Sequence, residues 1–126
     1  MKSAMKTVRQ EDENDCGVAC VAMLTGADYA EVRNALYPLG RVRKLKTAEL
    51  CAALKAFGRK PVGDRRRPFG AKTLQELPSD ALVFVTLHNN GAEHRHWIVW
   101  DATAKKPRDP YRPKCEYDLR GYILVE

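Results

Sequence analysis

Residues 15–24 read DCGVACVAML and contain the longest uninterrupted apolar run of the chain, the seven residues 18–24. Asn14 or Asp15 can cap a helix here, because their side chains accept hydrogen bonds from the first N–H groups of a helix. A helix over residues 16–24 would be apolar on every side, so we expect it to be buried. The run is far short of the roughly 20 residues that a transmembrane helix needs. This stretch therefore predicts an interior helix and no membrane span.

Two further helices are expected before residue 58. Asp28 and Glu31 have the spacing of a capping box, and the helix that they open would end before Pro38. Thr47 can cap the next helix, and Gly58 gives it a stop signal. The first half of the chain is therefore predicted to be helical.

The hydrophobic pattern changes in the second half of the chain. Residues 81–87 and 96–100 are short runs rich in branched and aromatic side chains, which favours buried strands. Asn89-Asn90-Gly91 between them is a strong turn signal, so the two strands are expected to form a hairpin. Residues 121–125 supply a later strand. Helices followed by an antiparallel sheet indicate an α+β domain.

The size and charge of the chain indicate how many domains it forms and which class of protein it belongs to. Its 126 residues predict one domain over residues 1–126. Hydrophobic residues make up 44% and charged residues 30%, which is typical of a globular protein. The net charge of +6 favours acidic partners without singling out nucleic acid, because 16 acidic residues are interspersed. The basic cluster Arg65-Arg66-Arg67, between Gly63 and Pro68, is predicted to be an exposed loop.

The N-terminal segment and the cysteines bear on location. Residues 1–15 are polar and lack the apolar core of a secretory signal, so we expect the protein to stay in the cytoplasm. The four cysteines are few for a secreted disulfide scaffold and match no CxxC zinc spacing. Reduced thiols are therefore the expected state.

Cys16 is the thiol with a physical reason to be nucleophilic. It lies at the predicted N-terminus of the buried helix, where unpaired N–H groups and the helix dipole favour an anion such as a thiolate. Cys20 and Cys51 lie within apolar helical patterns, and we interpret them as core residues. Cys115 lies in a polar stretch, and the sequence gives it no role.

Three histidines, His88, His94 and His96, are candidates for the acid–base partner that a thiolate nucleophile needs. His96 opens a predicted strand on which Ile98 and Trp100 share its face and would hold the ring in place. His88 and His94 fall in the predicted hairpin loop, where solvated histidines are more usual. His96 is therefore the predicted base.

An acidic side chain should orient the imidazole of this base. A return strand that turns around residues 102–103 would place Asp109 opposite His96 and end at Pro110. Asp101 is closer in the sequence, but it lies five residues after His96. Because side chains alternate along a strand, an odd spacing places Asp101 on the opposite face. Asp109 is therefore the predicted acid, with the alternative that it only forms an Asp-Pro turn.

Gln10 is the candidate for stabilising negative charge in the reaction. Attack on a peptide or thioester carbonyl produces an oxyanion, which needs hydrogen-bond donors. Gln10 lies six residues before Cys16, and its side-chain amide could fold back beside the thiol to act with the Cys16 backbone N–H. By itself, a glutamine in a polar segment is nearly uninformative.

Four motifs follow one another along the chain: Gln10, DCGVAC at residues 15–20, HWIV at residues 96–99, and Asp109-Pro110. Together they resemble the C39 peptidases, the papain-like domains that process bacteriocin precursors. The resemblance implies a papain-like fold in which the first cysteine of the DCG motif attacks and the histidine of HWIV is the base. It also implies that the aspartate orients the histidine and that the glutamine builds the oxyanion hole. Such an acyl-enzyme mechanism needs no metal or cofactor.

The resemblance also implies a substrate and a partner. Most members are the N-terminal part of a transporter with membrane helices and an ATPase, whereas this sequence has no long apolar span and no phosphate-binding loop motif. We therefore expect a free-standing domain or a separated fragment. The substrate of the family is a leader peptide cut after a double glycine. The resemblance therefore implies a peptide or protein substrate, and it also implies a transporter or secretion partner.

Three other functions stay open at this point. A papain-like hydrolase or transferase could act on another amide or isopeptide bond, because fold and triad do not fix the substrate. A non-catalytic relative could bind peptides. A nucleic-acid-binding module could use the basic cluster at residues 65–67, with zinc on Cys16, Cys20, His94 and His96. That ligand spacing is unusual, and nucleic acid is the least favoured partner.

Overall fold

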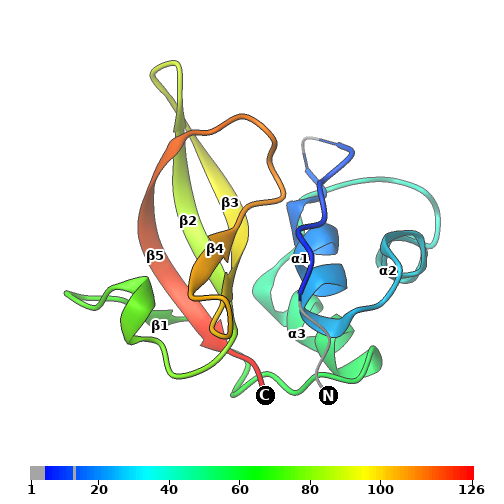
Figure 1. Ribbon diagram of the computed structural model, residues 1–126. Helices are drawn as coiled ribbons and strands as arrows, with labels where there is room; N and C mark the ends of the chain where they lie inside the picture. Colours follow the sequence, from blue (N-terminus) through cyan, green and yellow to red (C-terminus); the bar gives the residue numbers. More distant parts are fainter. Residues whose placement is uncertain (1–4, 13) are drawn as a thin grey trace.

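The computed structural model describes residues 5–12 and 14–126, which form three α-helices and a five-stranded antiparallel sheet. The helices are α1 (Cys16–Thr25), α2 (Tyr29–Leu36) and α3 (Thr47–Ala56), and a 3-10 turn follows at Leu74–Glu76. The strands are β1 (Arg67–Pro68), β2 (Ala81–Asn89), β3 (Ala92–Asp101), β4 (Lys106–Arg108) and β5 (Glu116–Leu124). The helices lie on one side of the sheet, with α1 between the sheet and α2 (Figure 1). The predicted α+β class is confirmed.

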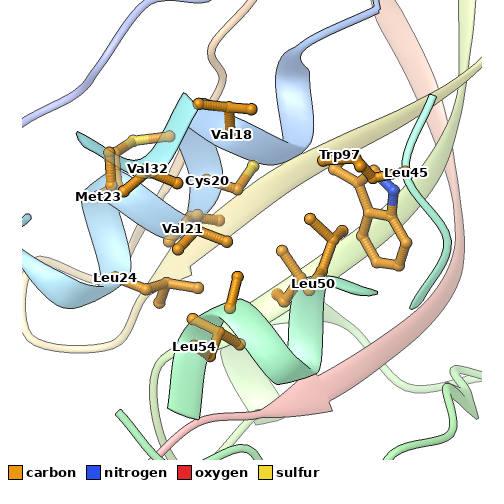
Figure 2. Close-up of a cluster of buried hydrophobic side chains, with 14 of the residues drawn as sticks. Val18, Cys20, Val21, Met23, Leu24, Val32, Leu45, Leu50, Leu54 and Trp97 are labelled. Carbon is orange, nitrogen blue, oxygen red and sulfur yellow. The ribbon is translucent and has the colours of Figure 1, made fainter. Parts of the chain in front are cut away.

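Helix α1 is the centre of the larger hydrophobic core. Residues 16–24 are all buried, because no face of the helix carries polar side chains. Figure 2 shows Leu50, Leu54 and Trp97 packed around the apolar side chains of α1. Burying a large apolar side chain stabilises the folded state by about 1.5–3 kcal/mol. The predicted interior helix is confirmed, and no helix in residues 5–12 and 14–126 is long and apolar enough to cross a membrane.

The other face of the sheet carries a second, smaller core. Ile98 and Trp100 belong to it, together with Phe69 from the segment between β1 and β2. Trp97 and Val99 alternate with them along β3 and belong to the core around α1. This is the alternation expected of a strand that is buried on both faces. Strand β3 therefore gives a rigid support to the histidine at its buried end.

The helix ends differ from the predicted caps. Asp15 is the N-cap residue of α1, but its carboxylate makes no capping bond and accepts hydrogen bonds from the backbone N–H groups of Glu11 and Asp12. Asp28 precedes α2 without a side-chain capping bond, so the predicted capping box is wrong. Thr47 is the first helical residue of α3 and does not cap it. The helices form where predicted, because packing of their apolar faces stabilises them more than the caps do.

The strands β2 and β3 form the predicted hairpin. Asn89 pairs with Ala92, so Asn90 and Gly91 make a two-residue turn. Both turn residues have positive φ, 52° and 81°, as the tight turns of hairpins require. The two strands extend further than predicted, because the backbone ladder continues through polar residues at the turn. The sheet order is β1-β5-β2-β3-β4.

The return strand after β3 has a different register from the predicted one. Asp101 pairs with Lys106, which leaves a four-residue turn and moves its centre one residue later than predicted. The carboxylate of Asp101 accepts a hydrogen bond from the Ala104 N–H (3.1 Å) and so favours this wider turn. The predicted pairing of His96 with Asp109 is therefore wrong, and Asp109 lies just beyond the end of β4.

The basic cluster is exposed as expected, but it is not only a loop. Arg67 and Pro68 form β1, which pairs with Tyr122 and Gly121 of β5. Gly121 permits this close approach, since a Cβ atom there would lie 3.1 Å from the Cβ of Arg66. The predicted loop is thus wrong in part, and pairing with β5 fixes the backbone of Arg67.

Candidate active site

Cys16 is the first residue of α1, the predicted position at a helix N-terminus. It is 7% exposed and lines a cleft of about 290 Å³ with Gly17, Leu45 and Trp97 among the other lining residues. Gly17 lets this end of α1 pack closely on α3, because a Cβ there would lie 2.7 Å from a methyl group of Leu50. The helix dipole favours an anion at this position. Cys16 is therefore a thiol at the floor of an open cleft.

His96 lies between Cys16 and Asp109. Its Nε2 atom is 2.6 Å from Oδ1 of Asp109, and its ring is close enough to the Cys16 thiol for that thiol to raise the pKa of His96. Since Nε2 is hydrogen-bonded to Asp109, Nδ1 is the ring nitrogen that is available to the thiol. The structure thus brings together a thiol from α1, an imidazole from β3 and a carboxylate from the segment after β4.

The surroundings of His96 act on its pKa in opposite directions. The residue is 4% exposed, and this burial, the largest influence, lowers the pKa. The hydrogen bonds and charges of Asp109 and Cys16 outweigh burial and raise the pKa of His96 to about 9. At neutral pH the ring is therefore protonated, which is the form that stabilises a neighbouring thiolate.

Asp109 is held in place by a local turn. Its Oδ1 atom accepts a hydrogen bond from the Tyr111 N–H (2.8 Å), and its carbonyl oxygen accepts one from the Arg9 guanidinium (2.8 Å). The Tyr111 ring stands edge-on to the His96 ring, with 6.1 Å between the centroids. Sequence analysis missed Tyr111, although its place two residues after Asp109 in an Asp-Pro turn is a signal that could have found it.

Asp101, the competing acid, is occupied by other partners. Its Oδ2 atom accepts a hydrogen bond from Nε of Arg108 (2.8 Å), and its Oδ1 atom accepts one from the Ala104 N–H (3.1 Å). Burial acts to raise the pKa of Asp101, but these hydrogen bonds outweigh it and hold the pKa below its usual range. Asp109 is thus the carboxylate beside His96.

Gln10 lies beside His96, in a second hollow of about 190 Å³ that both residues line. Its backbone N–H donates to the carbonyl of Pro110 (2.9 Å), which joins the N-terminal segment to the turn after β4. Its side-chain Nε2 donates to the carbonyl of Asp12 (2.8 Å). The Gln10 amide thus makes this hydrogen bond within its own segment, and its role as an oxyanion donor stays a prediction.

Asp15 organises the segment before α1. It is fully buried, and its carboxylate accepts hydrogen bonds from the N–H groups of Glu11 and Asp12 and from the Tyr29 hydroxyl. The Arg33 guanidinium lies 3.8 Å from it. Burial, the largest influence, raises the pKa of Asp15 above its ordinary value. Sequence analysis took this residue for a cap and missed its role in fixing the loop.

The residues considered for zinc do not come together. Cys20 is fully buried in the core, and this burial raises its pKa well above the usual value. His94 is exposed on β3, and His88 lies on β2, so the predicted loop positions of both are wrong. Within the described part of the chain, no three histidine, cysteine or acidic side chains gather as a metal site. The zinc set that includes Cys16 and His96 is therefore contradicted.

Comparison with known proteins identifies the family. A family model described as the Peptidase C39 family matches residues 4–108, most of the chain. The matched stretch contains Gln10, Cys16 and His96 and ends one residue before Asp109. No curated protein matches the chain significantly. The chain belongs to the Peptidase C39 family, whose members are cysteine peptidases of papain-like fold.

Proposed function

We propose that this protein cleaves peptide bonds through a Cys16–His96–Asp109 triad. The observation that carries the proposal is the placement of His96, 2.6 Å from the Asp109 carboxylate and close enough to the Cys16 thiol for that thiol to raise its pKa. The thiolate attacks the carbonyl carbon, and the protonated imidazole gives its proton to the amine as the C–N bond breaks. Water deprotonated by His96 then hydrolyses the thioester and releases Cys16.

The remaining residues of the site support these steps. Asp109 accepts the hydrogen bond of Nε2–H, which keeps Nδ1 directed at the thiol and stabilises the charged ring. The Cys16 N–H at the start of α1 donates to the carbonyl oxygen as it becomes negative. Gln10 supplies the second donor once its Nε2 exchanges the Asp12 carbonyl for the substrate oxygen.

Replacing Gln10 by alanine should lower kcat by about a hundredfold, because an oxyanion donor acts only in the transition state. The rate at which iodoacetamide alkylates Cys16 should change little. Steady-state kinetics and alkylation rates test this directly. Gln75→Ala is the matched control, since Gln75 is exposed in the 3-10 turn and lines none of the hollows described above. Wild-type turnover by the Gln10 variant would remove Gln10 from the oxyanion hole.

We propose a double-glycine leader peptide as the substrate. Membership of the C39 family supports this proposal. So do the bulky side chains of Leu45, Phe84 and Trp97 in the cleft at Cys16, which favour small residues next to the bond that is cut. The natural substrate would then be a bacteriocin-like precursor handed over by a transporter or secretion partner. The four cysteines are free thiols, which suits cleavage in the cytoplasm.

A peptide library tests both the reaction and the specificity. Wild-type and Cys16→Ala protein are incubated with a diverse library, and new termini are compared by mass spectrometry. We expect termini after Gly-Gly or Gly-Ala that depend on Cys16. Cleavage after large or charged residues would contradict the double-glycine specificity while keeping the nucleophile. Turnover of isopeptide or side-chain amide bonds alone would favour the alternative hydrolase over a peptidase.

A further inference from the structure

A third hollow, of about 510 Å³, opens beside the cleft of the nucleophile and shares part of its lining with it. Arg66, Phe84 and Arg95 line both spaces. Arg67 and Arg120 line the third hollow but not the cleft. A bound chain could therefore pass from one space into the other without leaving the surface.

The charge of this hollow is strongly one-sided. Four arginines line it, and no acidic side chain does. Arg120 lies 3.9 Å from the carboxylate of Asp118, a long and exposed ion pair. In the part of the chain that the structure describes, no carboxylate forms a salt bridge with Arg66, Arg67 or Arg95. The hollow therefore offers uncompensated positive charge to a ligand.

The sheet holds the side chains of Arg66 and Arg120 and the backbone of Arg67 in place. The Arg66 guanidinium stacks on the Phe84 ring, 4.1 Å from its centroid. The backbone of Arg67 is paired with β5, and Nε of Arg120 donates to the Thr86 hydroxyl (2.8 Å). Side chains that are already ordered lose less conformational entropy when a ligand binds. These contacts leave other guanidinium N–H groups for a ligand, and planar guanidinium groups suit the two oxygens of a carboxylate.

We propose that this hollow, the arginine subsite (Arg66, Arg67, Arg95 and Arg120), binds acidic side chains of the peptide substrate. The proposal rests on the proposed function, because the subsite adjoins the cleft in which Cys16 would meet the scissile bond and shares Arg66 and Arg95 with it. This position next to the proposed peptidase site favours a peptide over a nucleic acid. A substrate with glutamate or aspartate a few residues from the cleavage point would reach both places at once.

Binding to the Cys16→Ala protein tests the subsite without turnover. Labelled Gly-Gly peptides carry three glutamates on either the N-terminal or the C-terminal side, and matched peptides carry glutamines. By fluorescence anisotropy, one glutamate peptide should bind about tenfold more tightly than its glutamine match, and this difference should shrink with added salt. Equal affinities of the glutamate and glutamine peptides on both sides would overturn the proposal. So would tighter binding of a single-stranded oligonucleotide.

Arginine variants locate the effect. Arg66→Gln and Arg95→Gln should each weaken binding of the glutamate peptide several-fold more than binding of the glutamine peptide. Arg120→Gln gives a further test at a side chain that does not line the cleft of Cys16. Arg65→Gln is the matched control, because it removes the same charge from an exposed neighbour that lines neither space. An equal loss in the Arg65 variant would reduce the effect to net charge and overturn the subsite.

Cleavage by the protein with Cys16 intact separates this proposal from the proposed function. Cysteine-dependent cleavage with equal kcat/KM for glutamate and glutamine peptides would remove the subsite and keep the peptidase. Tight binding that depends on Arg66, without cleavage of any peptide, would remove the peptidase and keep acidic-peptide binding. Higher kcat/KM for the glutamate peptide, lost in Arg95→Gln but kept in Arg65→Gln, is the result that we expect.

Discussion

Replacing Cys16 by alanine should lower the rate of peptide cleavage by about 10⁴-fold or more, because the site would lose its nucleophile. The fold should persist, since the change removes one sulfur atom from the lining of a cleft. Turnover and thermal unfolding of the same preparation measure the two effects separately. Cys115→Ala is the matched control, because Cys115 is half-buried and lines none of the three hollows described. Wild-type turnover by the Cys16 variant would contradict the proposed reaction.

Thiol reactivity and pH dependence add to this test. Iodoacetamide should label Cys16 first, because burial raises the pKa of both Cys20 and Cys51. The raised pKa of His96, about 9, means that the ring keeps its proton at neutral pH and loses it on the alkaline side. Since the protonated ring donates to the leaving amine, kcat/KM should fall as pH rises through about 9. First labelling of Cys115 at neutral pH would count against this site.

The buried helix and the hairpin could be predicted because each follows from local sequence. Residues 16–24 are apolar on every side, so a helix there has no face to present to water. Asn90-Gly91 meets the need for two consecutive positive φ angles, and the strands on either side fix the rest. Each feature depends only on residues that are close together in the sequence, and both features are found in the structure.

Features that depend on distant partners could not be predicted in this way. Asp15 does not cap its helix, because the folded segment before it brings two backbone N–H groups to the carboxylate. Arg67 joins the sheet because Gly121, far along the chain, leaves room for its neighbour Arg66. The composition of residues 63–68 alone predicts an exposed loop at this position. In each case a tertiary contact overrides a sound local preference.

The predicted register, which paired Asp109 with His96, is wrong, and strand geometry explains why Asp109 still lies beside His96. The observed pairing differs from the predicted pairing by two residues, and a shift of two keeps every side chain on its face. Continued beyond β4, this register places Asp109 nearest Ile98, a diagonal neighbour of His96. The carboxylate then reaches Nε2 at 2.6 Å. Its catalytic role, like those of Cys16 and Gln10, stays a prediction.

The second large effect is therefore expected at Asp109. Asp109→Asn should lower kcat by about a thousandfold, because the amide is a poorer partner for the charged imidazole and can present its N–H₂ group to Nε2. The carboxylate also raises the pKa of His96, so the alkaline limb of kcat/KM should move to lower pH in this variant. Kinetics across a pH series measure both changes.

Asp101→Asn is the matched control for this substitution. Asp101 is buried and accepts hydrogen bonds from Arg108 and Ala104, so its replacement should cost about 1–3 kcal/mol of unfolding free energy and leave kcat and the pH profile of the folded protein unchanged. Thermal unfolding and kinetics with one peptide compare the two variants. The opposite ranking, a large loss of kcat at Asp101 and only a stability change at Asp109, would show that Asp101 orients the imidazole during the reaction. That result would require β4 and its turn to rearrange around the bound substrate, because Asp109 is the carboxylate 2.6 Å from Nε2 in the structure without substrate.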